Sequence, residues 1–163
     1  MRARAAAPAD AGAINAIYNQ GIEDRIATFE TRLRTPQEIE AWFDGRHPIV
    51  VVEHDGRVIA FAATFAYRPR ACYEGVAEVS VYVDRQFRAQ GAGRLALSEL
   101  IKHAEVEGFW KLLSRIFPEN HASRALIASL GFREVGIYEK HGRLDRIWRD
   151  VIIVELLIPS NFR

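Results

Sequence analysis

One segment of the chain has the pattern of a strand, a glycine-containing loop and a helix in immediate succession. In residues 76–83, Val79, Val81 and Val83 lie on one face, and Glu78, Ser80 and Tyr82 lie on the other, as is typical of a β-strand. The loop that follows contains Gly91 and Gly93 and leads into a helical stripe of apolar residues. Such a loop turns backbone N–H groups outward at the positive end of the helix dipole, and glycines let a ligand approach closely. The pattern predicts a phosphate-binding loop, to which Arg88 and Arg94 add positive charge.

The sequence of this loop does not by itself identify a class of ligand. It lacks the third glycine of a Rossmann fingerprint and the Gly-Lys-Ser/Thr ending of a P-loop. Gly91 and Gly93 would also suit a tight helix start that binds nothing.

The remaining chain alternates between helix and strand patterns. The expected strands lie at residues 3–7, 48–53, 58–67, 76–83, 110–116, 132–140 and 143–158. The expected helices follow the cap Asp10, open at Thr35 and Pro36, follow the glycine loop, and begin at Asn120. We expect the last two strands to meet at a turn formed by His141 and Gly142. This order predicts a mixed sheet covered by helices.

Length and composition exclude several classes of protein. A chain of 163 residues suits one domain, residues 1–163, and its net charge of +1 is too balanced for a nucleic-acid binder. The lone cysteine, Cys72, cannot build a zinc site from paired cysteines, and it has no obvious base beside it. No stretch approaches the ~20 apolar residues that cross a bilayer, and the first residues lack the apolar core of a signal peptide. We expect a cytoplasmic protein with no nucleic-acid or membrane partner.

The strand, the loop and several scattered segments together carry a resemblance. The spacing Arg88-x-x-Gly91-x-Gly93 is similar to the pyrophosphate-binding motif of the GNAT acetyltransferase superfamily. Further matches are to its phosphinothricin N-acetyltransferase-like branch, which includes methionine sulfoximine and arsinothricin acetyltransferases. The matching segments are ATFET (27–31), EVSVYV (78–83), FPEN (117–120), LGF (130–132), KHGRLD (140–145) and WRDV (148–151). They run in order and extend the resemblance from about Ala3 to about Ile158.

The resemblance implies a GNAT fold, which is α/β (mixed α+β). Such a fold has a central, largely antiparallel sheet of six to seven strands, flanked by about four helices. It also implies acetyl-CoA as the co-substrate, no metal, and a homodimer.

The resemblance further implies where acetyl-CoA binds. The backbone of Val81, Tyr82 and Val83 would hydrogen-bond the pantetheine arm, which fills a gap beside this strand. The pyrophosphate would lie in the cradle formed by Arg88, Ala89, Gln90, Gly91, Ala92, Gly93 and Arg94. Asn120 would hold the cofactor near the start of the next helix, although asparagine there also suits a plain N-cap.

Acetyl transfer to an amine needs a group that removes a proton, because an ammonium has no lone pair and an α-amino group is mostly protonated at pH 7. Glu78 is the candidate base, acting through water; a solvated or salt-bridged strand glutamate is the alternative. Glu30 is the rival base. A backbone N–H near Val81 would stabilise negative charge on the thioester oxygen.

The general acid is not assigned by the sequence. Many GNAT enzymes carry a tyrosine where this chain has Ile127, so the leaving thiolate would be protonated by solvent or by another group such as Tyr138.

Family substrates are amino acids with a carboxylate and a second polar or anionic head. Arg68 and Arg70, followed by Tyr73, would bind such anions because a guanidinium forms bidentate hydrogen bonds; a solvated basic loop is the alternative. Phe29 and Glu30 would contact the substrate, and Thr28 and Phe29 would form a lid over the site. His141 would line the pocket from the last hairpin, or else be an exposed turn residue.

The favoured hypothesis is an N-acetyltransferase that detoxifies a small amino-acid-like compound of the phosphinothricin, methionine sulfoximine or arsinothricin type. The alternatives are an acetyltransferase for a protein N-terminus or a polyamine, and a non-catalytic acetyl-CoA-binding module. Only the replacement of the usual tyrosine by Ile127 favours the binding module.

Overall fold

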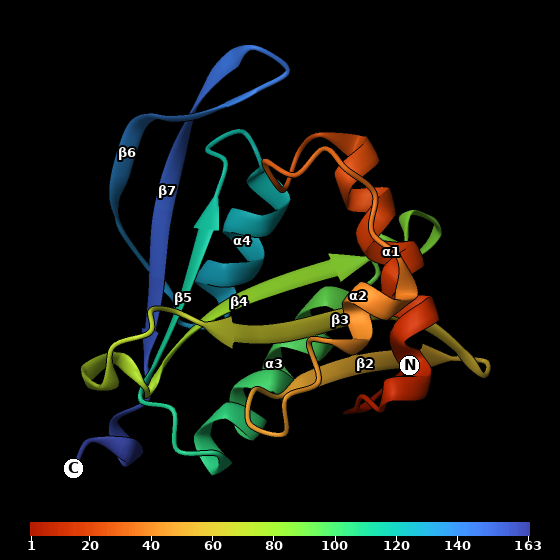
Figure 1. The fold of residues 1–163 in the computed structure, drawn as a ribbon, viewed down its shortest axis with the longest axis horizontal. Helices are drawn as coiled ribbons and strands as arrows, with labels where there is room; N and C mark the ends of the chain where they lie inside the picture. Colours follow the sequence, from red (N-terminus) through yellow and green to blue (C-terminus); the bar gives the residue numbers. More distant parts are fainter.

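The computed structural model describes residues 1–163 and contains one seven-stranded sheet with the order β1-β2-β3-β4-β5-β7-β6 (Figure 1). The strands are β1 Arg2–Ala5, β2 Ile49–His54, β3 Arg57–Ala66, β4 Val76–Val83, β5 Lys111–Ile116, β6 Arg133–Leu144 and β7 Ile147–Leu157. Every neighbouring pair is antiparallel except β4 with β5, which is parallel. The predicted mixed, largely antiparallel sheet is confirmed.

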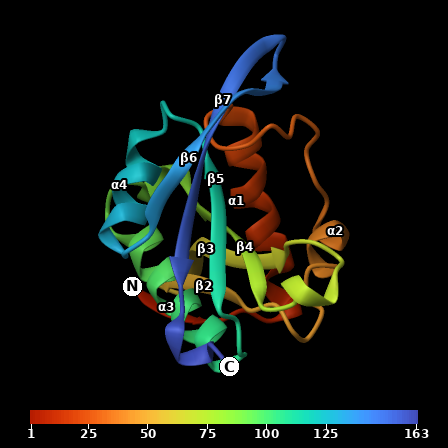
Figure 2. The same ribbon diagram turned by 90° about the vertical axis from the view of Figure 1, so that its left-hand side faces the viewer.

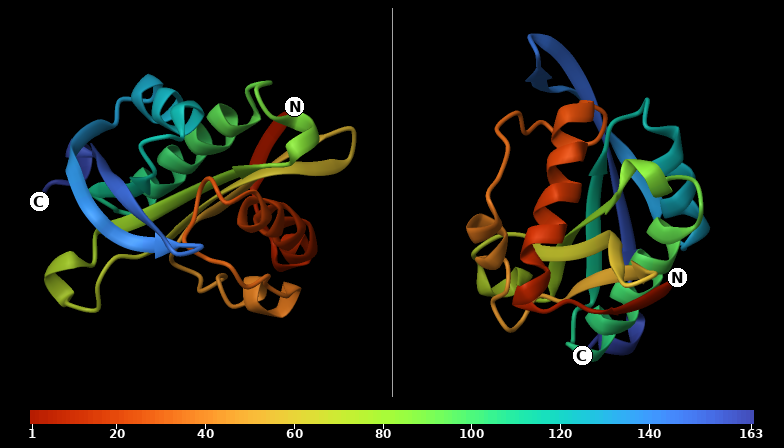
Figure 3. Two further views of the ribbon diagram at one scale, coloured as in Figure 1. Left: turned by 90° about the horizontal axis from the view of Figure 1, so that it is seen from above. Right: turned by 90° about the vertical axis from the view of Figure 1, so that its right-hand side faces the viewer.

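Helices cover both faces of the sheet, as Figure 3 shows in the view from above. They are α1 Ala11–Asp24, α2 Pro36–Glu40, α3 Ala92–Val106 and α4 His121–Ser129. Helices α1 and α2 lie against one face, and α3 and α4 lie against the other. None of these helices is long and apolar enough to cross a membrane.

The core is divided by the sheet into two layers, because side chains of a strand alternate between its faces. In β2, for example, Val50 and Val52 belong to the larger cluster with Leu97 and Leu100 of α3. Val51 of the same strand belongs to the smaller cluster under α1 and α2. The continuous apolar run of β2 is therefore explained by burial on both faces.

Strands β4 and β5 form the one parallel pair, and they pair only briefly. Their register joins Val76–Glu78 to Lys111–Leu113, and beyond these residues the two strands diverge (Figure 1). The divergence splits the sheet into two wings, with β1 to β4 in one and β5 to β7 in the other.

The turn predicted at His141 and Gly142 is wrong. Strand β6 continues through both residues to Leu144, and the hairpin reverses at Asp145 and Arg146, which have φ values of 50° and 67°. Gly142 serves a different purpose: a Cβ there would lie 2.9 Å from two ring atoms of Phe29. The glycine permits a close tertiary approach, which a local pattern cannot distinguish from a turn. The completed β6–β7 hairpin projects beyond the rest of the molecule (Figure 2).

The cap predicted for the first helix also differs from the structure. The Asp10 side chain does not cap α1. Its carboxylate accepts the Ala7 N–H at 2.8 Å and pairs with Arg4 at 2.8 Å, closing a short 3-10 turn over Pro8–Asp10. Arg4 of β1 thus forms an ion pair with Asp10, a residue type that locally favours helix capping. The Thr35 cap of α2 is confirmed, since its Oγ1 accepts the Glu38 N–H.

Candidate active site

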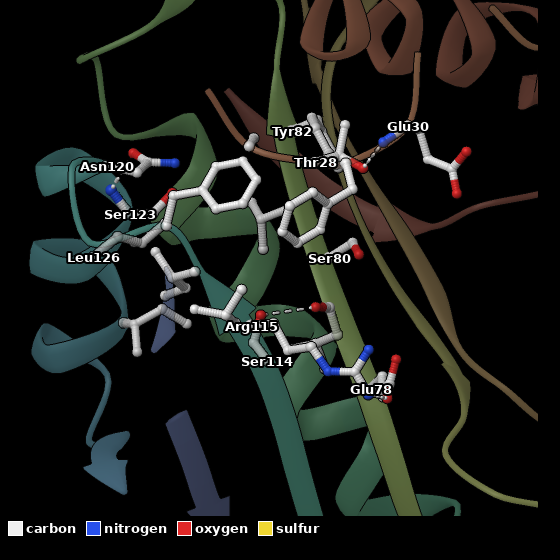
Figure 4. Close-up of a pocket in the computed structure, with 18 of the residues that line it drawn as sticks. Thr28, Glu30, Glu78, Ser80, Tyr82, Ser114, Arg115, Asn120, Ser123 and Leu126 are labelled. Atoms are coloured by element: carbon white, nitrogen blue, oxygen red, sulfur yellow. Dashed lines mark hydrogen bonds and ion pairs between the residues drawn. The ribbon is translucent and has the colours of Figure 1, made fainter. Parts of the chain in front are cut away.

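A cavity of about 540 Å³ lies where β4 and β5 diverge (Figure 4). This volume is common for a small-molecule site. Strands β4 and β5 form its floor, α4 contributes one wall, and the loop at residues 27–30 contributes another. Figure 4 shows Glu78, Ser80 and Tyr82 along β4, opposite Ser114 and Arg115 of β5.

The cavity reaches both faces of the sheet. Val79 and Val81 contact the core layer of α3, whereas Tyr82 contacts the core layer of α1. By the same alternation, Glu78 and Ser80 share the face of Tyr82. One part of the cavity is therefore apolar and faces α4, and the other carries the polar side chains.

Backbone groups of β4 are directed into the divergence. The Val79 carbonyl accepts a hydrogen bond from Ser114 Oγ of β5 at 3.1 Å, so this residue presents its backbone to β5. Backbone direction alternates along a strand paired in antiparallel fashion, so Val81 and Val83 present their N–H and C=O groups to the same side. Strand β5 no longer pairs with β4 at these positions. The divergence thus leaves a strand edge ready to hydrogen-bond an extended ligand.

The glycine loop has the geometry of a phosphate-binding loop. Ala89 and Gly91 have positive φ values of 61° and 91°, and Gly91 precedes the first turn of α3. A Cβ on Gly93 would lie 3.3 Å from Val83 Cγ2 and 3.4 Å from Leu126 Cδ2. Glycine at this position therefore lets α3 begin directly against the end of β4 and against α4. The residues of this loop lie beyond the end of β4 and do not line the cavity itself.

The two arginines that flank the loop are held by neighbouring groups. Arg88 donates to the Val83 carbonyl at 3.3 Å and pairs with Asp24 at 2.6 Å, and Arg94 donates to Ser129 Oγ at 2.5 Å. Both arginines are exposed, so their guanidinium groups remain accessible beside the loop. Gln90 donates to the Gln86 carbonyl.

Glu78 faces a cation that the sequence pattern did not reveal. Arg115 Nη2 lies 2.8 Å from Glu78 Oε1, and the side chains of Arg115 and Glu78 are 51% and 30% exposed. Glu78 pairs in register with Leu113, so alternation puts Arg115 on the same face, two residues further along β5. Because Arg115 is exposed and its strand carries other polar residues, the sequence pattern offered no signal for this pairing.

The other candidate base, Glu30, lies on the loop over the cavity. Its carboxylate pairs with Arg34 at 2.5 Å and its side chain is 49% exposed. The neighbouring Phe29 is anchored by an edge-to-face contact with Phe117, with ring centroids 4.9 Å apart. Thr28, Phe29 and Glu30 all line the cavity.

Two tyrosines form an inner wall of the cavity. Tyr18 and Tyr82 stack with centroids 5.2 Å apart, and burial raises the pKa of both phenols. Tyr82 packs over Gly21, where a Cβ would approach ring atom Cε1 to 2.5 Å. Both phenols stay neutral at physiological pH and act as rigid walls.

Asn120 serves as a helix cap and also lines the cavity. Its Oδ1 accepts the Ser123 N–H at 3.2 Å, and its Nδ2 donates to the Ile26 carbonyl at 3.3 Å. The side chain therefore joins the start of α4 to Ile26, directly before the loop at residues 27–30.

The structure does not bring every predicted residue to the cavity. Arg68, Arg70 and Tyr73 lie in the connection between β3 and β4, where the guanidinium groups stack on the rings of Tyr67 and Tyr73. Tyr138 is 52% exposed and does not line the cavity; its ring contacts that of His141 at a tilt, with centroids 4.8 Å apart. His141 itself lines the cavity.

The usual tyrosine position is occupied by an apolar side chain in the structure. Ile127 is buried and lines the apolar part of the cavity, so no side chain there can donate a proton. No group of three or more His, Cys, Asp or Glu side chains is arranged to hold a metal ion.

Comparisons with known proteins agree with this geometry. The model of the Acetyltransferase (GNAT) family matches residues 15–132. An L-methionine sulfoximine/L-methionine sulfone acetyltransferase of Pseudomonas aeruginosa is 32% identical, over 94% of this chain and 92% of the relative.

Two solved structures have the same fold over nearly the whole chain. The ribosomal-protein-alanine N-acetyltransferase of Brucella melitensis has a TM-score of 0.92 at 31% identity and covers 97% of this chain and 100% of its own. The phosphinothricin acetyltransferase of Sinorhizobium meliloti, solved with acetyl-CoA, has a TM-score of 0.89 at 28% identity and covers 96% and 88%. This chain belongs to the GNAT acetyltransferase family and is an acetyl-CoA-dependent N-acetyltransferase.

Proposed function

We propose that this enzyme acetylates the α-amino group of a small amino-acid-like compound of the phosphinothricin, methionine sulfoximine or arsinothricin type, and so detoxifies it. The observation that carries the proposal is the pairing of a carboxylate, Glu78, with a guanidinium, Arg115, inside the cavity at the strand divergence. Relatives named for phosphinothricin and methionine sulfoximine support the same substrate class.

Acetyl-CoA supplies the acetyl group as a thioester, and the features of β4 and α3 fit such a ligand. The backbone groups of Val81 and Val83 that β5 leaves unpaired would hold an extended pantetheine arm, with the Val83 carbonyl shared with Arg88. The loop at residues 88–94 and the start of α3 would bind the pyrophosphate. The close approach permitted by Gly93 keeps these two subsites adjacent.

On the polar side of the cavity, Glu78 would accept the proton that the acceptor ammonium must lose, directly or through a water molecule. Val81 N–H would stabilise negative charge on the thioester oxygen. Burial keeps the Tyr82 phenol protonated, but its ring is stacked on Tyr18. The buried Ile127 side chain has no proton to donate. We therefore assign protonation of the leaving thiolate to solvent.

The first experiment is release of CoA thiol from acetyl-CoA in the presence of a panel of acceptors. The panel holds phosphinothricin, methionine sulfoximine, methionine sulfone, arsinothricin, spermidine and a short peptide. We expect turnover of at least one amino-acid analogue and none of spermidine. Turnover of spermidine or of the peptide alone would contradict the proposed substrate class and leave the chemistry intact.

A protein N-terminus is the second candidate acceptor, because one structural neighbour is named a ribosomal-protein-alanine N-acetyltransferase. The same panel separates the two, since a peptide N-terminus has no free carboxylate beside its amine. A protein that binds acetyl-CoA but releases no thiol with any acceptor would instead be a binding module.

We also propose a homodimer in the cytoplasm, where acetyl-CoA is available. Support for the dimer comes from exposed apolar side chains concentrated on the β6–β7 hairpin: Val135, Ile137, Tyr138, Ile147 and Trp148. A cluster of this kind marks an interaction surface more often than a solvated one. Fractionation of cells tests the location.

A further inference from the structure

We propose that Arg115 binds the carboxylate of the acceptor, so that the Glu78–Arg115 pair recognises the two opposite charges of a free α-amino acid. The inference rests on the proposed function and assigns its substrate specificity to a residue outside the predicted set. Arg68 and Arg70 lie outside the cavity, so they leave that role open.

Arg115 is the only Lys or Arg side chain among the residues that line the cavity. Figure 4 shows it beside Glu78, at the polar end of the site. Other arginines nearby are held by other groups: Arg34 by Glu30, and Arg149 by Glu119 and the ring of Phe117. An anion that enters the cavity therefore meets a single guanidinium, and His141 is the one other lining side chain that can carry positive charge.

The guanidinium is also free to bind more than Glu78. Its one hydrogen bond within the protein runs from Nη2 to Glu78 Oε1, at 2.8 Å. An arginine has five N–H donors in a planar fork, so a second carboxylate can bind without displacing the first. The side chain is 51% exposed, which leaves room for that second partner.

The charges of the pair complement those of an amino acid. A free α-amino acid carries an ammonium and a carboxylate on one carbon, a few ångströms apart. Arg115 can take the carboxylate while Glu78 faces the ammonium, from which it must remove a proton. The two requirements, recognition and deprotonation, are met by neighbouring atoms on β4 and β5.

This arrangement predicts which amines are poor acceptors. A polyamine has no anion for Arg115 and brings further positive charge toward it. A carboxamide or a peptide N-terminus likewise lacks the adjacent carboxylate. Selectivity for free amino acids should therefore depend on Arg115 in particular.

The test compares the fastest amino-acid acceptor of the panel above with its own carboxamide. Both acceptors need Glu78 equally, so the ratio of their kcat/KM values isolates recognition of the carboxylate. We expect the wild-type enzyme to favour the acid about 10- to 100-fold, as for one charge-assisted hydrogen bond. Arg115→Gln should raise KM for the acid and abolish this preference, and Arg115→Lys should keep part of it.

Two matched variants complete the experiment. Arg133→Gln removes an arginine from an ion pair with Glu155 outside the cavity and should leave the ratio unchanged. Arg68→Gln tests the rival arginine of the β3–β4 connection. Stabilisation by acetyl-CoA in a thermal shift shows that each variant is folded.

A preference for the acid that survives in Arg115→Gln, or disappears in Arg68→Gln, would overturn the assignment while leaving the proposed function standing. A wild-type enzyme that acetylates no amino acid of the panel would overturn the proposed function and this inference together.

Discussion

Glu78 and Glu30 are the two carboxylates that line the cavity, and each has its own arginine. Glu78 is fixed on a strand, with Arg115 on the neighbouring strand. Glu30 lies on a loop and is more exposed, and its partner Arg34 is four residues away in the same segment. A base must be held at a fixed distance from the reacting amine, which favours the strand residue.

We therefore predict that Glu78→Gln lowers kcat about 100- to 10,000-fold, because it replaces a general base by an amide of nearly the same shape. Binding of acetyl-CoA should not change, since the cofactor-binding features lie along Val81, Val83 and the glycine loop. Steady-state kinetics and a thermal shift with acetyl-CoA measure the two effects. Glu30→Gln is the matched control, and a larger loss of kcat there would make Glu30 the base.

A second prediction at this scale concerns Gly75, just before β4. A Cβ at this position would overlap the six-membered ring of Trp110, so the indole or the strand would have to move. We expect Gly75→Ala to lower the free energy of unfolding by about 1–3 kcal/mol, as for an overpacked core.

Gly12 is the control for that substitution, because it lies in α1 and a Cβ added there would have nothing within 4 Å. Gly12→Ala should raise stability by about 0.5–1 kcal/mol through helix propensity alone. Urea unfolding of both variants measures the difference, and equal effects would contradict the argument from Trp110.

At the scale of elements, one carboxylate joins three strands. Glu155 of β7 is buried and lies 2.7 Å from Lys111 of β5 and 3.0 Å from Arg133 of β6. The hydrogen bond from Lys111, with a further contribution from Arg133, holds the pKa of Glu155 below its usual value of 4.5. The strand wing that forms half of the cavity is thus tied together by charge.

This lowered pKa has a definite consequence for stability. A carboxyl group whose pKa is lower in the folded state stabilises the protein above its unfolded pKa, and the contribution is lost as pH falls through the folded value. We expect Glu155→Gln to destabilise the protein by about 1–3 kcal/mol near pH 7 and by less below about pH 4.

Urea unfolding at both pH values measures this dependence. Glu107→Gln, at an exposed position outside these ion pairs, is the control and should show no such change with pH. A loss for Glu155→Gln that is the same at both pH values would exclude the ion pairs as its cause.

At the scale of the whole molecule, the β6–β7 hairpin extends past the body of the sheet and exposes Ile137 and Trp148 by 58% and 56% (Figure 2). We predict that the protein has twice the mass of one chain in light scattering, and that Ile137→Glu shifts it to the monomer because a charge cannot be buried in such a contact.

Val106→Glu is the matched control, since Val106 is 84% exposed at the end of α3 and away from the hairpin. A monomeric wild-type protein, or an equal effect of both variants, would contradict the hairpin interface. We also expect residues 1–163 to unfold in one transition, because all seven strands share one sheet.

Much of the architecture could be predicted from local patterns, because those patterns coincide with the tertiary contacts. The stripe Leu97, Leu100 and Ala104 is buried against the sheet, and Gly91 has the positive φ that starts α3. The alternation in β4 correctly separates the valines from Glu78 and Ser80. In each case the period of the element decides which side chain meets the core.

The errors occur where a separate segment decides a residue's role. Gly142 suits a turn by itself, but the ring of Phe29 requires it inside a strand. Asp10 suits a helix cap, but its carboxylate forms an ion pair with Arg4 instead. Arg68 and Arg70 do not line the cavity, and their role in substrate binding stays a prediction.

The order of residues was enough to identify the family, the succession of strand, loop and helix, and the candidate carboxylate of the site. Two features came only from the folded chain: β4 and β5 part after three paired residues each, and Arg115 meets Glu78 across that divergence. The physical reason is that pairing between strands distant in sequence depends on backbone direction and on helix packing at both faces. Neither quantity is encoded in the pattern of one segment.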